Sequence, residues 1–255
     1  MTATAAMPAT ALAELLRSMA DDEFVIGFSD SEWTGIAPLL EEDVAMSSLA
    51  QDELGHATAL YGLLAGLTGT EPDALAYDRE PSAYRHCRLL DHARGDWAMA
   101  ICRRYLYDTA DAVRLEALAG GAWAPLAELV GKLVREERYH LMHAGAWLDR
   151  LGRDRHEGRP RLLGALDVLG PDAATVFATL PGEAALIEAG ILAAPMTELE
   201  GRWRASIAPA FDALDLPAPQ AMRDPDTARL EHGEAFQWLW GQFTSVRHAE
   251  PGATW

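Results

Sequence analysis

Apolar residues recur every three or four positions along most of the chain, which is the spacing of an amphipathic α-helix. Near the start, Leu12, Leu15, Leu16 and Met19 follow this spacing. The same pattern, interrupted by Gly and Pro, predicts helices over residues 10–35, 38–65, 87–92, 97–119, 123–151, 160–180, 183–190, 197–214 and 225–247. Alternating β-branched segments are scarce and Asn-Gly hairpin turns are absent, so no sheet is expected. The sequence therefore predicts an all-α protein.

The length of the chain is compatible with one large helical domain. We expect a single domain over residues 1–255, in three parts. Residues 1–8 are predicted to be a disordered tail. Residues 9–152 contain the four long helices and are predicted to form a four-helix bundle, and residues 153–255 a helical extension packed on it.

Two of the predicted long helices carry the same motif, Glu-x-x-His. It occurs as Glu53 with His56 and as Glu137 with His140. Residues three apart lie on one face of a helix, so each motif offers a carboxylate and an imidazole together. Two such pairs, with one further carboxylate from each of two other helices, form the ligand set of the di-metal centres in ferritin-like bundles.

The two further carboxylates can be sought by register, because antiparallel neighbours bring residues level when they are equidistant from the connecting loop. Glu23 precedes Glu53 by 30 residues, and Asp108 precedes Glu137 by 29. This agreement indicates a repeated pair of helices with its acids and histidines aligned. The predicted metal ligands are Glu23, Glu53, His56, Asp108, Glu137 and His140.

Other interpretations stay open for each ligand. Glu23 lies near other acids, any of which could fall in register by chance. Asp108 lies in an apolar stretch where an unpaired carboxylate would be costly, and its alternative role is to pair with Arg104 or Arg114. A single Glu-x-x-His motif is more often a solvated Glu with a core or surface His than a metal site.

The oxygen-rich donor set with two imidazoles and no thiolate favours iron, or else manganese. Groups next to the ligands would orient the histidines. The candidates are Gln51, Asp52, Glu136 and Tyr139, each of which is alternatively a plain surface residue. His143 is read as an outer neighbour of the site or as a packing residue.

The net charge of −18 narrows the classes of partner. It argues against nucleic acid and against an anionic membrane surface, because both need clustered Lys and Arg. No uncharged segment is long enough to cross a bilayer, and no secretory leader is expected. Cys87 and Cys102 form no disulfide framework, so the reducing cytoplasm is the expected location.

With these residues in view, the sequence resembles the C subunits (PaaC) of bacterial phenylacetyl-CoA epoxidases, within the ferritin-like di-iron carboxylate superfamily. The stretches that carry the resemblance are residues 31–38, 40–45, 138–141, 145–152 and the closing helix into Trp255. The resemblance implies a ferritin-like bundle that works in a multicomponent monooxygenase of phenylacetate degradation. It implies a homo- or hetero-oligomer with a catalytic A-type subunit, a separate reductase that supplies electrons, and an aromatic acyl-CoA substrate.

The chain also departs from that family. The best-known C subunits have lost their metal site, whereas the segment from Gln51 to His56 looks like the metal motif of the A subunits, and Glu23 is present as well. Three hypotheses follow. The chain is an oxygenase component with its own di-iron site, a non-catalytic partner of the A subunit, or an independent di-metal oxidase.

Overall fold

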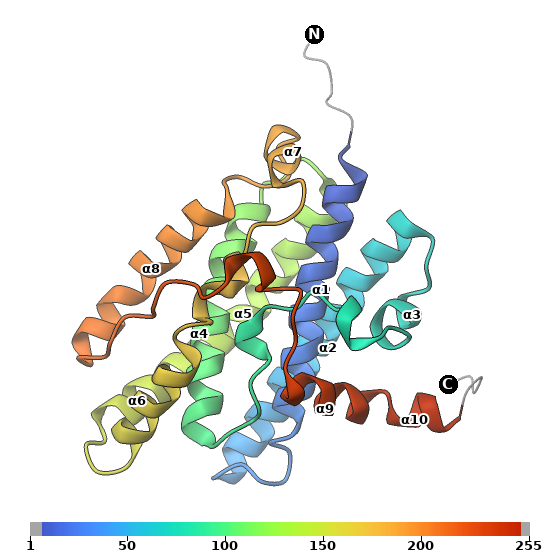
Figure 1. The fold of residues 1–255 in the computed structure, drawn as a ribbon. Coiled ribbons are helices and arrows are strands. Elements are labelled where there is room, and N and C mark those ends of the chain that lie inside the picture. Colours follow the sequence, from blue (N-terminus) through green and yellow to red (C-terminus); the bar gives the residue numbers. More distant parts are fainter. Residues whose placement is uncertain (1–6, 251–255) are drawn as a thin grey trace.

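The computed structural model describes residues 7–250, and all regular structure within that range is helical (Figure 1). The predicted all-α class is therefore confirmed. Of the predicted disordered tail, residues 1–6 lie outside the described part, as does Trp255 at the other end. None of the described helices is long and apolar enough to cross a bilayer.

Four long helices form the bundle. They are α1 (Ala9–Ser31), α2 (Leu40–Thr68), α4 (Trp97–Leu118) and α5 (Ala124–Arg153). Helix α1 packs along α2, and α4 packs along α5, as Figure 1 shows. Asp96 caps the start of α4, because its side chain accepts a hydrogen bond of 2.9 Å from the backbone N–H of Met99.

A glycine on α1 allows the first pair of helices to approach closely at the level of the metal motif. A Cβ added to Gly27 would lie 3.0 Å from Cγ of Leu54 and 3.2 Å from Cβ of Glu53. These separations are tighter than ordinary van der Waals contact. The absence of a side chain at Gly27 thus sets the distance between α1 and α2 next to Glu53.

The extension packs on the outside of α4 and along α1. Helices α6 (Gly158–Leu169) and α8 (Met196–Ala213) lie against α4. Trp203 of α8 is fully buried and donates a hydrogen bond of 2.9 Å to Thr109 of α4. Helices α9 (Glu234–Phe243) and α10 (Ser245–Ala249) end the described chain, where Phe243 contacts Phe24 of α1.

Several predicted helix boundaries were wrong. Helix α2 begins at Leu40 rather than Pro38, after an extended Leu39. The helix predicted over residues 160–180 ends at Leu169, because Pro171 lacks the N–H that continuation needs. A short 3₁₀ turn over Ala173–Phe177 and helix α7 (Glu183–Glu188) follow it.

The predicted final helix is also shorter. A 3₁₀ turn at Pro225–Thr227 precedes α9, which begins only at Glu234, and Thr244 separates α9 from α10. The segment after α2, for which no helix was predicted before residue 87, contains helix α3 (Pro72–Tyr77) and a 3₁₀ turn at Pro81–Ala83. The short helix predicted near residue 87 is a 3₁₀ turn at Arg88–Leu90.

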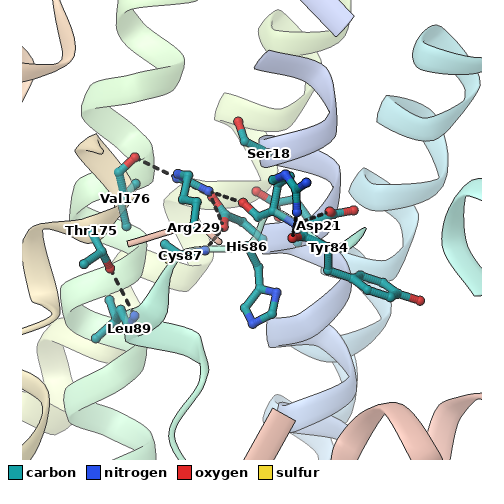
Figure 2. A network of polar contacts seen from close by, with 12 residues as sticks. Ser18, Asp21, Tyr84, His86, Cys87, Leu89, Thr175, Val176 and Arg229 are labelled. Carbon is teal, nitrogen blue, oxygen red and sulfur yellow. Dashed lines mark hydrogen bonds and ion pairs between the residues drawn. The ribbon is translucent and has the colours of Figure 1, made fainter. Parts of the chain in front are cut away.

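A buried polar network fastens the extension to the bundle. Arg229 donates to the backbone carbonyl of Val176 at 2.8 Å and to Oδ1 of Asp22 at 2.9 Å. The backbone N–H of Leu89 donates to the hydroxyl of Thr175 at 3.1 Å. Figure 2 shows Arg229 bonded to Val176 and Leu89 bonded to Thr175. The segment around Arg229 is therefore held against α1, about two hundred residues earlier in the chain, by charge-assisted hydrogen bonds to Asp22.

Candidate metal centre

Four buried side chains from three bundle helices converge inside the bundle. Glu23 comes from α1, Glu53 and His56 from α2, and Glu137 from α5. Each offers one ligand atom, and these four atoms all lie within 4.8 Å of one another. All four side chains are buried. This group, called the Glu/His cluster below, contains four of the six predicted ligands.

The imidazole of His56 faces the three carboxylates. Its Nδ1 lies 3.4 Å from Oε2 of Glu23, and 3.5 Å from both Oε2 of Glu53 and Oε1 of Glu137. Atoms bound at about 2.1 Å to one ion lie about 3.0–3.4 Å apart in octahedral to tetrahedral geometry. The three separations from Nδ1 of His56 are therefore close to those between atoms that bind one ion.

Several atoms of the cluster make no hydrogen bond within the described residues. They are Nδ1 of His56 and Oε2 of Glu23, Glu53 and Glu137. Buried polar atoms are almost always satisfied. Three of these atoms, Nδ1 of His56 and Oε2 of Glu23 and Glu53, lie close together and are of the types that bind iron and manganese, so they fit a cation.

His140 lies on the other side of Glu53 and Glu137. Its Nδ1 is 3.3 Å from Oε1 of Glu53 and 3.2 Å from Oε1 of Glu137. The rings of His56 and His140 are close to parallel, with centroids 6.1 Å apart. The predicted alignment of the two Glu-x-x-His motifs thus brings both histidines to the same pair of carboxylates.

Asp108, the sixth predicted ligand, faces an arginine. Its Oδ1 lies 2.9 Å from Nη2 of Arg104, one helical turn earlier on α4. This is a close ion pair, although the N–H is not aligned for a hydrogen bond. Arg104 was the alternative partner that the sequence left open for Asp108. The charges of Glu137 and His140 influence the pKa of Asp108, but its close contact is with Arg104.

Arg104 is the main feature of the site that the sequence analysis did not assign to it. Its side chain is fully buried, with Nη1 2.5 Å from Oε1 of Glu53 and 3.2 Å from Oδ2 of Asp30. The spacing of Arg104 and Asp108 along α4 was a signal for their pairing. The contacts to Asp30 and Glu53 join different helices, so no local pattern reveals them.

The neighbouring acids on α1 separate cleanly. Asp21 pairs with Arg79 and Tyr61, and Asp22 pairs with Arg114 and Arg229, whereas Glu23 faces the Glu/His cluster. Of these three acids, the sequence analysis chose Glu23 because it is level with Glu53 across the connecting loop, and Glu23 is the one that faces the cluster. The hydroxyl of Tyr107 donates to Oε1 of Glu23 at 2.9 Å and orients it.

Outer groups hold the two histidines. Oε2 of Glu136 lies 2.9 Å from Nε2 of His56, and Oδ2 of Asp52 lies 3.4 Å from Nε2 of His140. Both acids were predicted to orient the histidines. His143 pairs with Glu42 at 2.7 Å, away from the Glu/His cluster. The other two candidates for this role, Gln51 and Tyr139, have exposed side chains.

The similarity to known proteins agrees with this architecture. The model of the phenylacetic acid catabolic protein family, PaaA_PaaC, matches residues 1–255. The chain belongs to this family. The C subunit of the 1,2-phenylacetyl-CoA epoxidase of Escherichia coli (strain K12) is 28% identical over 240 residues, which are 93% of this chain and 96% of the relative. The resemblance drawn from the sequence is confirmed, and it extends over bundle and extension alike.

In this PaaA_PaaC member, the charges of the site depend strongly on one another. Burial alone would lower the pKa of His56, but the carboxylates of Glu23 and Glu53 outweigh it and raise the pKa to about 12. Burial is likewise outweighed at His140, where Glu137 and Glu53 raise the pKa to about 11. Burial and the nearby Glu53 raise the pKa of Glu23.

Glu53 differs from Glu23. Burial would raise its pKa, but the guanidinium of Arg104 holds it well below the usual range. Without a metal ion, Glu53 therefore stays anionic at neutral pH. The rings of His56 and His140 are then protonated on both nitrogens and carry a positive charge. A metal ion that binds the Glu/His cluster has to displace the proton of His56, because only a deprotonated imidazole nitrogen is a ligand.

Proposed function

We propose that this chain is the C-type subunit of a multicomponent epoxidase that acts on an aromatic acyl-CoA, phenylacetyl-CoA in the first instance. The family and the Escherichia coli relative support this role. We further propose that its Glu/His cluster binds iron, or else manganese. The observation that carries the metal assignment is the set of four buried side chains whose ligand atoms lie within 4.8 Å of one another, with the unsatisfied Nδ1 of His56 facing the unsatisfied Oε2 of Glu23 and of Glu53.

The residues of the chain would hold the metal and control its surroundings. Glu23, Glu53 and Glu137 supply carboxylate oxygens, His56 supplies Nδ1, and Glu136 fixes the ring through Nε2. Bound iron supplies the redox chemistry by which dioxygen is activated for insertion into an aromatic ring. The buried position of the four ligands excludes bulk water from that chemistry.

The complex would contain two further components. A catalytic A-type subunit binds this chain, and a separate reductase supplies electrons. These partners and the acyl-CoA substrate are inferred from the family and from the relative. The acidic chain, with a net charge of −18, suits docking to a basic surface of a partner.

A second candidate function is that of a non-catalytic partner that supports the A-type subunit. Two observations favour it. Arg104 already compensates the charge of Glu53 and Asp108 without metal. In addition, a cavity of about 450 Å³ lies at the end of α1 against α9, and its lining includes Glu32, His92 and Arg94. None of its lining residues belongs to the Glu/His cluster, so a molecule bound in this cavity would not lie against the proposed metal ligands.

The two functions differ in how the complex responds to Glu23→Gln. Glutamine can still accept the hydrogen bond of Tyr107 but removes one anionic ligand. The complex of this chain, the A-type subunit and the reductase would be assayed for epoxidation of phenylacetyl-CoA, and this chain for metal content. An oxygenase role predicts loss of both metal and turnover, whereas a supporting role predicts loss of metal with turnover intact.

Glu128→Gln is the matched control, because Glu128 is exposed on α5 away from the Glu/His cluster. It should change neither quantity. If the chain forms no complex with an A-type subunit, the assignment as a C-type subunit is wrong.

A further inference from the structure

The carboxylate of Glu53 has two sides with different neighbours. Its Oε2 makes no hydrogen bond and lies 3.5 Å from Nδ1 of His56, within the Glu/His cluster. Its Oε1 lies 2.5 Å from Nη1 of Arg104 and 3.3 Å from Nδ1 of His140. Both sides of Glu53 thus face buried ligand atoms that make no hydrogen bond, such as Nδ1 of His56 on one side and Nδ1 of His140 on the other, but only the second side also holds a guanidinium.

The residues on the guanidinium side are those that a second metal ion would need. Asp108, His140 and Oε1 of Glu53 come from three helices and approach one region. Arg104 extends into that region, with Nη1 on Glu53 and Nη2 2.9 Å from Asp108. The carboxylate oxygens that would bind the second ion therefore already neutralise the charge of Arg104.

We propose that Arg104 takes the place of the second metal ion, so that the centre binds a single ion through Glu23, Glu53, His56 and Glu137. This inference rests on the proposed metal binding. It differs from the expected two-metal centre in the number of ions, and it keeps Glu23, Glu53, His56 and Glu137 as ligands.

The charge of Arg104 is permanent. A guanidinium does not lose its proton in a protein, so it cannot become a neutral neighbour of a second cation. A divalent ion bound between Glu53 and Asp108 would lie within a few ångströms of it, in a buried region where like charges repel strongly.

Arg104 also cannot swing away at low cost. Its side chain and those of Asp30, Glu53 and Asp108 are all fully buried. Moving the guanidinium out would leave the carboxylate of Asp30 buried without its partner, which is strongly unfavourable. Arg104 is thus a fixed cation in the core of the bundle.

The test measures bound manganese in the full-length chain. Protein is loaded anaerobically with Mn(II), freed of excess metal on a desalting column, and analysed for manganese per chain and by electron paramagnetic resonance. The wild type should hold about one ion with the spectrum of an isolated Mn(II). Arg104→Gln, which removes the charge, should roughly double the bound manganese and give the spectrum of two exchange-coupled ions.

Two variants serve as controls. Arg103→Gln changes the adjacent buried arginine, which donates to the backbone carbonyls of His92 and Ala93 rather than to the cluster. Arg104→Lys keeps the positive charge. Both should bind the same amount of manganese as the wild type, and circular dichroism verifies that each variant is folded.

The number of bound manganese ions shows whether the inference about Arg104 holds. About two coupled ions in the wild type would overturn the inference, even if Arg104→Gln fails to fold. An unchanged single ion in folded Arg104→Gln would show that Arg104 does not set the stoichiometry. No bound manganese or iron in any variant would overturn the proposed metal binding itself, and the inference with it.

Discussion

At the scale of single residues, the carboxylate of Glu136 is predicted to control how tightly the Glu/His cluster binds metal. It lies 2.9 Å from Nε2 of His56, on the ring edge opposite the ligand nitrogen. Outer partners of this kind fix the ring and its tautomer, and their loss costs about 10–100-fold in metal affinity. We expect Glu136→Gln to weaken Mn(II) binding by about that factor, measured by competition with a chelator of known affinity.

The control for this change is Glu128→Gln, which alters an exposed acid on the same helix. It removes the same charge without touching His56, so a similar loss of affinity in both variants would contradict the orienting role of Glu136.

The sequence predicted the residues of the two Glu-x-x-His motifs but not all of the ion pairs around them. Two Glu-x-x-His motifs, each about 30 residues after a lone acid, were sufficient to predict that Glu53, His56, Glu137 and His140 lie together. The sequence offered Arg104 only as a possible partner of Asp108 and did not reveal its contacts with Asp30 and Glu53, because these two acids approach it from other helices. Helical periodicity records which residues share a face, whereas ion pairs between helices depend on how the faces are rotated against each other.

At the scale of elements, the contact of α1 with α2 is predicted to depend on Gly27. A methyl group there would press on Cγ of Leu54 at 3.0 Å and on Cβ of Glu53 at 3.2 Å. The gain in helix propensity from Gly to Ala, about 0.5–1 kcal/mol, is opposed by overpacking of about 1–3 kcal/mol. Gly27→Ala should therefore lower the free energy of unfolding by about 1 kcal/mol, measured by urea denaturation.

Gly62→Ala provides the contrast on α2. No atom lies within 4 Å of a Cβ added there. This variant should gain about 0.5–1 kcal/mol from helix propensity alone. If Gly27→Ala is stabilised equally, the close approach of the two helices does not restrict that position.

A second element-scale prediction concerns Asp22, which joins α1 to Arg114 of α4 and to Arg229 of the extension. Burial would raise the pKa of Asp22, but the two arginines outweigh it and lower the pKa. A carboxyl with a lowered folded pKa contributes stability above its unfolded pKa of about 3.9 and loses it as the pH falls through the folded value. Asp22→Asn should cost about 3–5 kcal/mol at neutral pH, because it leaves buried arginines unpaired.

Urea denaturation from neutral pH down to about pH 3 checks this prediction. The difference between wild type and Asp22→Asn should narrow as the pH falls below about 3.9. Asp149→Asn, which removes an exposed ion pair with Arg153, should differ little from the wild type at any pH. A constant difference across the range would show that Asp22 acts through packing and not through its charge.

At the scale of the whole molecule, the bundle was easier to predict than the extension. The four long helices were placed with small boundary errors, because each is long and buries many apolar residues against its neighbours. Helix α8 was also placed to within one residue at each end, but the other segments after residue 170 are short, and contacts to α1 that a local pattern does not contain help to position them. The single-domain reading of the full chain remains a prediction.

The whole molecule is also predicted to fold without metal and to gain stability when metal binds. Arg104 and the protonated imidazoles of His56 and His140 compensate the buried carboxylates when no metal is bound. An ion that binds only the folded chain stabilises it by about 2.7 kcal/mol at a hundredfold excess over its Kd. For a chain of this size, that corresponds to a rise in Tm of about 5–10 °C.

Thermal denaturation, first with Mn(II) and then with a chelator, should show that this shift in Tm is reversible. The Glu23→Gln variant should not show the shift. Unfolding on chelation alone would show instead that the carboxylates of the bundle need a metal ion to be buried.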